Sequence, residues 1–188
     1  LGNSHYGLED IAIMRSIPNL TIVSPADCSE IVKVVHAAAD FEGPMYIRLT
    51  GAVGNPVVYS EDYNFTFGKS ITLKKGEDVT IIASGSMVYE SLQAANFLES
   101  HGISAEVINM HTIKPLDTEV LDKVFTSSKI IVSVEEHSVV GGLGSAIAEY
   151  KSQYFNSPGH LILGLPDNFG KTAAYRFLLE KYRLVREK

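Results

Sequence analysis

The sequence predicts an α/β fold, in which a partial domain is followed by a three-layer α/β/α domain with a mostly parallel sheet. Short apolar runs that suit buried strands alternate with longer segments whose apolar residues recur at helical spacing. Gly, Pro and Asn separate these segments, as expected at turns. The chain has 188 residues, 45% of them hydrophobic and 20% charged, so it can bury one or two sizeable cores.

The first region, residues 1–55, is expected to contain two helices and two strands. Ser24 is predicted to cap the second helix, because Pro25 suits a first helical position and Asp27 is an acid three residues after the cap. Arg48 falls near the end of the strand that follows this helix. In order, we expect a helix from about residue 8 that stops at 17–19, a strand at 20–23, a helix at 25–40 and a strand at 45–49.

Residues 50–68 are rich in turn formers and read as a surface linker, so we place a domain boundary there. The predicted division is 1–55, a linker at 56–75 and a second domain at 76–188. The expected elements of the second domain are strands at 79–84, 105–109, 130–135 and 161–165, and helices at 87–100, after Asp117, at 144–154 and at 173–182. Four strands that alternate with helices predict a mostly parallel sheet, covered on both faces and joined by right-handed crossovers.

Composition argues against several classes of function. The net charge of −6 and the pI near 5.5, with no basic stripe, argue against a nucleic-acid partner. The longest apolar runs are too short to span a membrane and the start lacks signal-peptide features, so we expect no membrane partner and a cytoplasmic location. The single Cys28 excludes an intrachain disulfide, and we expect it to be buried. Because the chain starts at Leu1 without Met, we expect the natural polypeptide to extend further toward the N-terminus.

Three motifs of the second domain each have a chemical and a structural interpretation. Gly142-Leu143-Gly144-Ser145-Ala146-Ile147 half-matches a dinucleotide-binding fingerprint, but Ile147 stands where the third glycine belongs, which favours a tight turn against the sheet. Ser84-Gly85-Ser86 could hold an anion, but no Lys or Arg follows closely, which favours a structural turn. Glu135-Glu136-His137 suits an acid/base pair at a strand end, with interface or turn hydrogen bonds as the alternative. Since no ligand pair at helical or hairpin spacing accompanies it, we expect no metal site.

His5 and Arg48 are the leading site candidates. His5 precedes a predicted helix, where free N–H groups gather, and its ordinary pKa of about 6.5 suits proton transfer or a hydrogen bond to a substrate oxygen. A polar residue that only starts the helix is the alternative for His5. Arg48 lies at the end of an apolar strand, so it should meet a carboxylate or a phosphate. A structural ion pair and a substrate contact are both open for Arg48.

Longer motifs resemble those of one known family. The first region resembles the second half of the pyrimidine-binding domain of transketolase-like thiamine diphosphate enzymes in the motifs Gly2-Asn3-Ser4-His5, Glu9-Asp10-Ile11-Ala12, Arg15-Ser16-Ile17-Pro18-Asn19 and Ser24-Pro25-Ala26-Asp27. The remainder resembles the transketolase C-terminal domain in Gly68-Lys69, Gly76-Glu77-Asp78-Val79-Thr80, residues 108–117, Glu135-Glu136-His137 and residues 141–145. The resemblance covers nearly the entire chain.

The resemblance implies a homodimer, or a heterotetramer of split subunits. Thiamine diphosphate then sits between the pyrimidine-binding domain of one chain and a diphosphate-binding domain of another, and its ylid transfers a two-carbon unit from a ketose or 2-oxo acid donor. By resemblance, His5 is a catalytic residue that hydrogen-bonds substrate oxygens, and Arg48 grips the phosphate of a sugar phosphate. Both would act by positioning and charge stabilisation. The C-terminal domain would serve dimer packing and stability.

Some features of the family pattern are not found in this sequence. Leu1 stands where transketolases and 1-deoxy-D-xylulose-5-phosphate synthases usually carry Asp, which bears on recognition of the donor hydroxyl. The family's activating Glu and pyrimidine-stacking aromatic residue lie upstream of Leu1, and the Gly-Asp-Gly…Asn pattern that holds Mg²⁺ and diphosphate is absent. We therefore expect thiamine diphosphate and Mg²⁺ in the intact enzyme, none in this chain alone, and no turnover by the isolated chain. A second copy or a complementary N-terminal subunit would carry the diphosphate-binding domain.

Three functional classes fit these observations. The first is a relative of transketolase or deoxyxylulose-phosphate synthase that acts on phosphorylated sugars, which Arg48 favours. The second is the β-subunit of a 2-oxo acid dehydrogenase, which generally lacks an arginine at that position. The third is a non-catalytic dimerisation or assembly domain that has kept only the fold.

Overall fold

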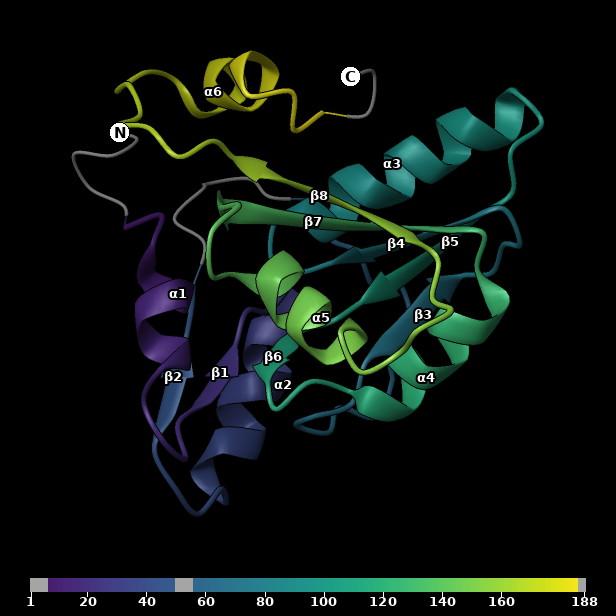
Figure 1. The fold of residues 1–188 in the computed structure, drawn as a ribbon. Helices are drawn as coiled ribbons and strands as arrows, with labels where there is room; N and C mark the ends of the chain where they lie inside the picture. The colour runs from purple at the N-terminus through teal and green to yellow at the C-terminus, as the bar shows by residue number, and fades with distance from the viewer. Residues whose placement is uncertain (1–6, 50–55, 186–188) are drawn as a thin grey trace.

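The computed structural model describes residues 7–49 and 56–185, whose strands form two sheets (Figure 1). The first region contributes two helices and two strands: α1 (Asp10–Arg15), β1 (Thr21–Val23), α2 (Cys28–Ala39) and β2 (Met45–Ile47). Strands β1 and β2 are parallel, so both carboxyl ends, and Arg48 with them, lie at the same edge. The third strand of this sheet, β6 (Thr112–Lys114), pairs antiparallel with β1 and comes from the second region.

Helix α2 begins later than predicted, because Asp27 and not Ser24 caps it. The Asp27 side chain accepts a hydrogen bond from Glu30 N at 2.8 Å, as Asp does at N-caps. Ser24 extends β1 instead: its N–H donates to His111 O at 2.7 Å, and its hydroxyl is buried without a hydrogen-bond partner. The prediction that Cys28 is buried was wrong: Cys28 is the first residue of α2 and is exposed.

The second sheet has five strands in the order β3-β5-β4-β7-β8. The strands of this sheet and the helices between and after them are β3 (Ile71–Lys74), β4 (Val79–Ala83), α3 (Met87–Ser100), β5 (Ala105–Asn109), α4 (Thr118–Ser127), β7 (Ile130–Ser138), α5 (Leu143–Lys151), β8 (Gly159–Leu165) and α6 (Tyr175–Lys181). Four of these strands are parallel, as predicted, and β3 is antiparallel to β5. The predicted cap of α4 is confirmed, since Asp117 accepts a hydrogen bond from Val120 N.

Helices cover both faces of the five-stranded sheet, which gives the predicted three layers (Figure 1). Helix α3 packs on one face through Ala95, against Ile81 and Val107. Helices α4 and α5 cover the other face, and their apolar residues share one buried cluster with residues of the first region, including Ile11 and Ile22. The two regions therefore share a core. No helix of the described ranges is both long and apolar enough to cross a membrane.

The segment expected to be a linker is tied to both regions. Val58 N donates to Asp27 Oδ2, and the hydroxyls of Tyr59 and Tyr63 donate to Glu30 Oε1 at 3.1 and 2.9 Å. Strand β3 lies within the expected linker range of 56–75, although the sequence analysis predicted no strand there. Its residues, ITLK, form a strand because they pair with β5, which is a tertiary contact and not a local pattern of the sequence.

Candidate functional site

Arg48 joins three elements at the carboxyl edge of β2. Its Nε donates a hydrogen bond to Asp10 Oδ2 at 2.8 Å, and its Nη2 donates to Glu136 O at 3.0 Å. The arginine side chain is 12% exposed and that of Asp10 17%, so this ion pair is largely withdrawn from water. Of the two partners expected for Arg48, a carboxylate or a phosphate, the structure supplies a carboxylate from the first residue of α1. These two contacts use two of the five N–H donors of a guanidinium.

Asp10 collects several partners on its carboxylate. The Tyr46 hydroxyl donates to the same Oδ2 at 2.8 Å, while the buried Oδ1 has no hydrogen-bond partner and lies 4.0 Å from His137 Nε2. Burial on its own would raise the pKa of Asp10, but the hydrogen bond and charge of Arg48, with the Tyr46 hydroxyl, outweigh it and lower that pKa. Burial and the neighbouring Asp10 raise the pKa of Tyr46 to about 12. The group is therefore a carboxylate held by a cation and a phenol.

His137 is fully buried and uses both ring nitrogens in contacts to the backbone. Nε2 accepts a hydrogen bond from Ala12 N at 3.3 Å, and Nδ1 donates to Ser138 O at 2.7 Å. One partner is a donor and the other an acceptor, which suits the neutral ring. The interface interpretation of Glu135-Glu136-His137 therefore describes the histidine, because neither nitrogen is available to a substrate in this arrangement.

Glu135 fills the glycine-containing turn before α5. Its carboxylate accepts hydrogen bonds from Leu143 N at 2.7 Å and Gly144 N at 2.9 Å. A Cβ on Gly142 would lie 2.0 Å from Glu135 Oε2, so any other residue there would displace this hydrogen-bonded carboxylate. Burial raises the pKa of Glu135 despite these N–H contacts. The N–H groups that would hold a phosphate are thus taken by the protein's own carboxylate, and the segment is a turn against the sheet.

Glu136 and the turn after β4 form one polar cluster. The Ser86 hydroxyl and the Tyr175 hydroxyl both donate to Glu136 Oε2, the second at 2.8 Å. Gly85 N donates to Ser24 O at 3.1 Å, which ties the same turn to the end of β1. The Ser84-Gly85-Ser86 segment is thus a structural turn, as predicted.

The first region covers the carboxyl edge of the five-stranded sheet near β7. Besides the Arg48 and Ala12 contacts, Ser138 N donates to Leu8 O at 2.8 Å, and Arg15 Nη1 donates to Gly141 O at 2.7 Å. In an open parallel sheet this edge is where ligands usually bind. Here it serves as the junction between the two regions, so the polar residues after β4 and β7 hold the fold together.

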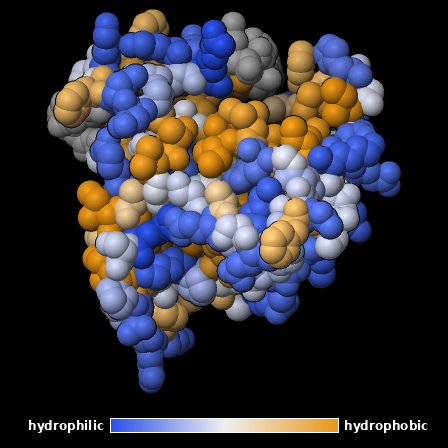
Figure 2. All heavy atoms as spheres, in the orientation of Figure 1, coloured by the Kyte–Doolittle hydropathy of each residue, from blue (hydrophilic) through white to orange (hydrophobic). Residues whose placement is uncertain are grey.

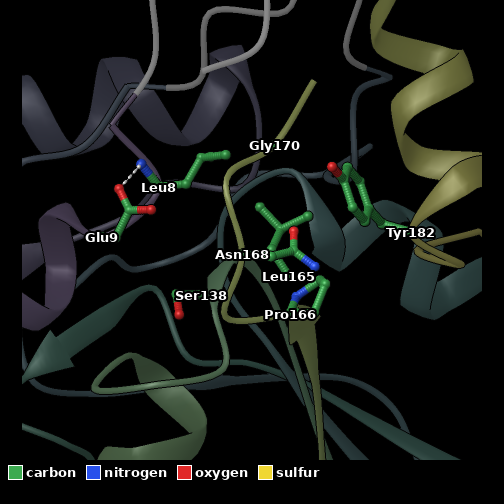
Figure 3. Close-up of a pocket in the computed structure, with 8 residues that line it drawn as sticks. All are labelled: Leu8, Glu9, Ser138, Leu165, Pro166, Asn168, Gly170 and Tyr182. Carbon is green, nitrogen blue, oxygen red and sulfur yellow. Dashed lines mark hydrogen bonds between the residues drawn. The ribbon is translucent and has the colours of Figure 1, made fainter. Parts of the chain in front are cut away.

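A small pocket that is open to solvent lies beside this junction, where β7 and β8 end (Figure 3). It is lined by Leu8, Glu9, Ser138, Leu165, Pro166, Asn168, Gly170 and Tyr182. The Glu9 carboxylate accepts a hydrogen bond from the neighbouring Leu8 N at 3.1 Å, as Figure 3 shows. The lining offers one carboxylate and no basic side chain, which does not suit a phosphate.

His5, the other leading candidate, lies outside the described residues, as does Leu1. The structure therefore places Arg48 and leaves the proximity of His5 and Arg48 open. Sequence reasoning missed Asp10 and Tyr46 as partners of Arg48. The signal that could have found Asp10 is the need of an inward-facing arginine for an acid, together with the acidic pair Glu9-Asp10 at the start of α1.

The role of another buried carboxylate, Glu30, was also missed. It is fully buried, and it accepts hydrogen bonds from Ala26 N at 2.6 Å, from Asn109 Nδ2 and from the Tyr59 and Tyr63 hydroxyls. Burial raises the pKa of Glu30 although all these donors favour its charged form. Its donors come from the turn before α2, from the segment after β2 and from β5, so Glu30 joins the two regions on the side of α2. Within the described ranges, no group of three or more His, Cys, Asp and Glu residues could hold a metal ion.

Comparison with known proteins places this arrangement in context. The family model described as "Transketolase, C-terminal domain" matches residues 68–187, and "Transketolase, pyrimidine binding domain" matches residues 1–53. A putative transketolase C-terminal section of Methanocaldococcus jannaschii is 40% identical over 97% of this chain and 57% of its own length. The 6-deoxy-6-sulfo-D-fructose transketolase subunit SqwH of a Clostridium species is 40% identical over 98% of this chain and 56% of its own length.

A solved structure to which this chain is similar is also that of a transketolase. A split-gene transketolase, described as an inactive β4 tetramer, has 44% sequence identity and a TM-score of 0.89. The match covers 98% of this chain and 59% of that one. The chain thus spans a little over half the length of the proteins that it matches.

Proposed function

Because this chain belongs to the transketolase family, we propose that it forms part of a thiamine diphosphate-dependent transferase that moves a two-carbon unit between sugar phosphates or 2-oxo acids. In this proposal residues 1–55 are the second half of the pyrimidine-binding domain and residues 76–188 the C-terminal domain. The observation that carries the proposal is the match of two transketolase domains, in this order, over 1–53 and 68–187.

The cofactor's diphosphate and Mg²⁺ do not fit the residues that the structure describes. Glu135 occupies the N–H groups of the turn before α5, and the pocket beside β7 and β8 has no basic lining. We therefore assign the diphosphate and Mg²⁺ to a complementary N-terminal subunit or a further domain. The intact enzyme would draw its carbanion chemistry from thiamine diphosphate. This chain's own part would be to bind and orient the substrate.

For substrate binding we propose His5 and Arg48. Arg48 is supported by its place at the carboxyl edge of two parallel strands, where Asp10 fixes the guanidinium through Nε. Its other N–H donors would meet an anionic group of the sugar. The sugar in the name of the Clostridium relative carries a sulfonate, which is an anion of similar shape to a phosphate. His5 would donate a hydrogen bond to a substrate oxygen.

We also propose an assembly for the chain. The relative described as a β4 tetramer is a split-gene transketolase and is described as inactive. By analogy, this chain would associate with itself when its complementary subunit is absent, and would gain activity only with that subunit. A cytoplasmic location is proposed because sugar phosphates are the expected substrates.

Reconstitution tests the proposed function. The chain would be mixed with the N-terminal subunit of a split transketolase, thiamine diphosphate, Mg²⁺, a ketose phosphate donor and an aldose phosphate acceptor. We expect two-carbon transfer in the mixture and none by the chain alone. Turnover by the isolated chain would contradict the assignment of the diphosphate site to a partner.

The nature of the substrate is tested with Arg48→Ala in the reconstituted enzyme. A rise in KM for a phosphorylated acceptor, with little change for an acceptor without phosphate, supports the anion contact. Equal losses for both acceptors would show that Arg48 serves only the ion pair with Asp10. Binding of thiamine diphosphate and Mg²⁺ to the mixture, measured by calorimetry, separates an enzyme from a non-catalytic assembly domain.

A further inference from the structure

Arg48 and Asp10 form a charged pair that is largely buried. Hydrophilic side chains cover much of the surface, as the face drawn in Figure 2 shows. The side chains of Arg48 and Asp10 depart from this pattern, since they are only 12% and 17% exposed. Two charges withdrawn from water remain stable only when hydrogen bonds fix them in a good geometry. The groups that fix this pair therefore decide how the guanidinium is presented.

Two contacts of Arg48 are made with the backbone of its neighbours. Its own N–H donates to Val23 O at 2.8 Å, so Arg48 continues the pairing of β2 with β1. Its Nη2 donates to Glu136 O at 3.0 Å. A third contact runs from Nε to Asp10 Oδ2 at 2.8 Å, and it depends on a side chain that can rotate. The direction of the guanidinium thus depends on how the Asp10 carboxylate is held.

The Tyr46 hydroxyl is placed to hold that carboxylate. It donates to the same Oδ2 at 2.8 Å. Tyr46 and Arg48 are two residues apart in an extended segment, so their side chains lie on one face and reach Asp10 together. The Tyr46 ring packs against the main cluster of buried apolar residues, which fixes its own position. Burial and the nearby Asp10 raise the pKa of Tyr46 to about 12, so the hydroxyl keeps its proton near neutral pH.

The other oxygen of Asp10 adds no comparable restraint. Oδ1 is buried, and none of the described residues donates a hydrogen bond to it. His137 Nε2 lies 4.0 Å away, but it accepts a hydrogen bond from Ala12 N and has no proton to give to Oδ1. Rotation of the carboxylate is therefore set by the two donors on Oδ2, Arg48 and Tyr46. Without the phenol, the guanidinium alone would hold the carboxylate that orients it.

We propose that Tyr46 is a positioning residue for substrate binding: its hydroxyl fixes Asp10, and Asp10 fixes the Arg48 guanidinium that meets the anionic group of the sugar. This inference rests on the substrate contact proposed above for Arg48. Tyr46 would favour phosphorylated over neutral acceptors without touching either of them. The hydroxyl would act through the geometry of Arg48, and so on the binding of the anion and not on the chemical step.

Kinetics of the reconstituted enzyme with Tyr46→Phe test this role. We expect KM for a phosphorylated acceptor to rise about 3- to 10-fold, with kcat and the KM for an acceptor without phosphate changed less than about 2-fold. The matched control is Tyr150→Phe, which removes a hydroxyl that donates to Asp122 Oδ1 at 2.7 Å and should leave both acceptors unaffected. A wild-type KM in Tyr46→Phe, or equal losses for both acceptors, would overturn the proposal.

A double-mutant cycle tests whether Tyr46 acts through Asp10. Asp10→Asn alone should raise KM for the phosphorylated acceptor at least as much as Tyr46→Phe does. Adding Tyr46→Phe to Asp10→Asn should then change KM by less than about 2-fold, because the carboxylate that Tyr46 holds is already gone. Effects that multiply independently would contradict the proposed order of contacts.

Hydrogen exchange of the Arg48 Nε–H, followed by nuclear magnetic resonance on the full chain, tests the positioning without substrate. Tyr46→Phe should speed this exchange about 10-fold, because the acceptor on Asp10 becomes mobile. The Nε–H of Arg15, whose side chain is 16% exposed, is the internal control and should keep its rate. An unchanged rate at Arg48 would refute the positioning role. An unchanged KM in Arg48→Ala would instead refute the substrate contact of the proposed function, so the two failures are distinguishable.

Discussion

Arg48 Nε lies 2.8 Å from Asp10 Oδ2, and this ion pair holds the end of β2 against the first turn of α1. The same guanidinium reaches Glu136 O in β7. One side chain thus joins two elements of the first region to the second.

Removing the arginine should destabilise the fold. Arg48→Ala leaves the Asp10 carboxylate buried without its cation, which should lower the free energy of unfolding by about 2 to 4 kcal/mol. Urea denaturation followed by circular dichroism measures this change. The control is Arg176→Ala, whose side chain is 60% exposed, and which should cost less than about 1 kcal/mol. Equal effects of the two substitutions would contradict a structural role for the ion pair.

Asp10 should make stability depend on pH in the acid range. Its pKa in the folded protein lies below the ordinary value of 3.8, so its contribution is fully present above that value and is lost as the pH falls through the lowered pKa. Asp10→Asn should therefore be less stable than wild type near neutral pH. The difference should shrink as the pH drops below about 4. Urea midpoints along a pH series measure it, and a difference independent of pH would contradict the assignment.

Glu30 should act in the opposite direction. Burial raises its pKa above the ordinary value of 4.5, so its protonation favours the folded state at low pH. That contribution is complete below pH 4.5 and is lost as the pH rises through the raised pKa. Glu30→Gln is neutral at every pH and should not show this loss. The free energy of unfolding of Glu30→Gln, relative to that of wild type, should therefore increase as the pH rises from 4.5 through the raised pKa. A difference that does not change with pH would show that the donors around Glu30 fully offset its burial.

Gly142 should tolerate no side chain. A Cβ there would lie 2.0 Å from Glu135 Oε2, and moving that carboxylate would free the N–H groups of Leu143 and Gly144. Gly142→Ala should lower the free energy of unfolding by about 2 to 4 kcal/mol. Gly159→Ala is the matched control, because a Cβ at Gly159 meets nothing within 4 Å. Thermal unfolding of both variants measures the contrast, and similar melting temperatures would contradict the role given to Glu135.

Much of the fold was predictable because it follows from local patterns. The helix at 87–100 and the strand at 105–109 occur at the predicted residues, and Asp117 caps the helix that follows it. Strands β3 and β6 were missed because they are short and owe their conformation to pairing with β5 and β1. Ser24 and Asp27, three residues apart, are both suitable N-cap residues for α2. Ser24 instead pairs with His111 through its N–H, a tertiary contact that the sequence does not reveal, and Asp27 is the cap.

The candidate site was predictable only in part. The need of Arg48 for an anionic partner follows from its apolar surroundings, but the choice of Asp10 depends on how α1 packs beside β2. The turn interpretation of Gly142 to Ile147 was correct, while the carboxylate that fills it, Glu135, lies on another element and gave no local signal. The role of His5 stays a prediction.

Strand β6 has a consequence for engineering this protein. It completes the sheet of the first region, although in the sequence it belongs to the second. The boundary between the two matched domains in the sequence is therefore not a boundary in the folded molecule. In a chimera made with a relative by one crossover between 53 and 68, β1 and β6 would come from different proteins. The relative's β6 would then have to pair with Ile22 and Val23 of β1. Exchange of the first region should succeed more often when residues 112–114 travel with it as a second, separate insert.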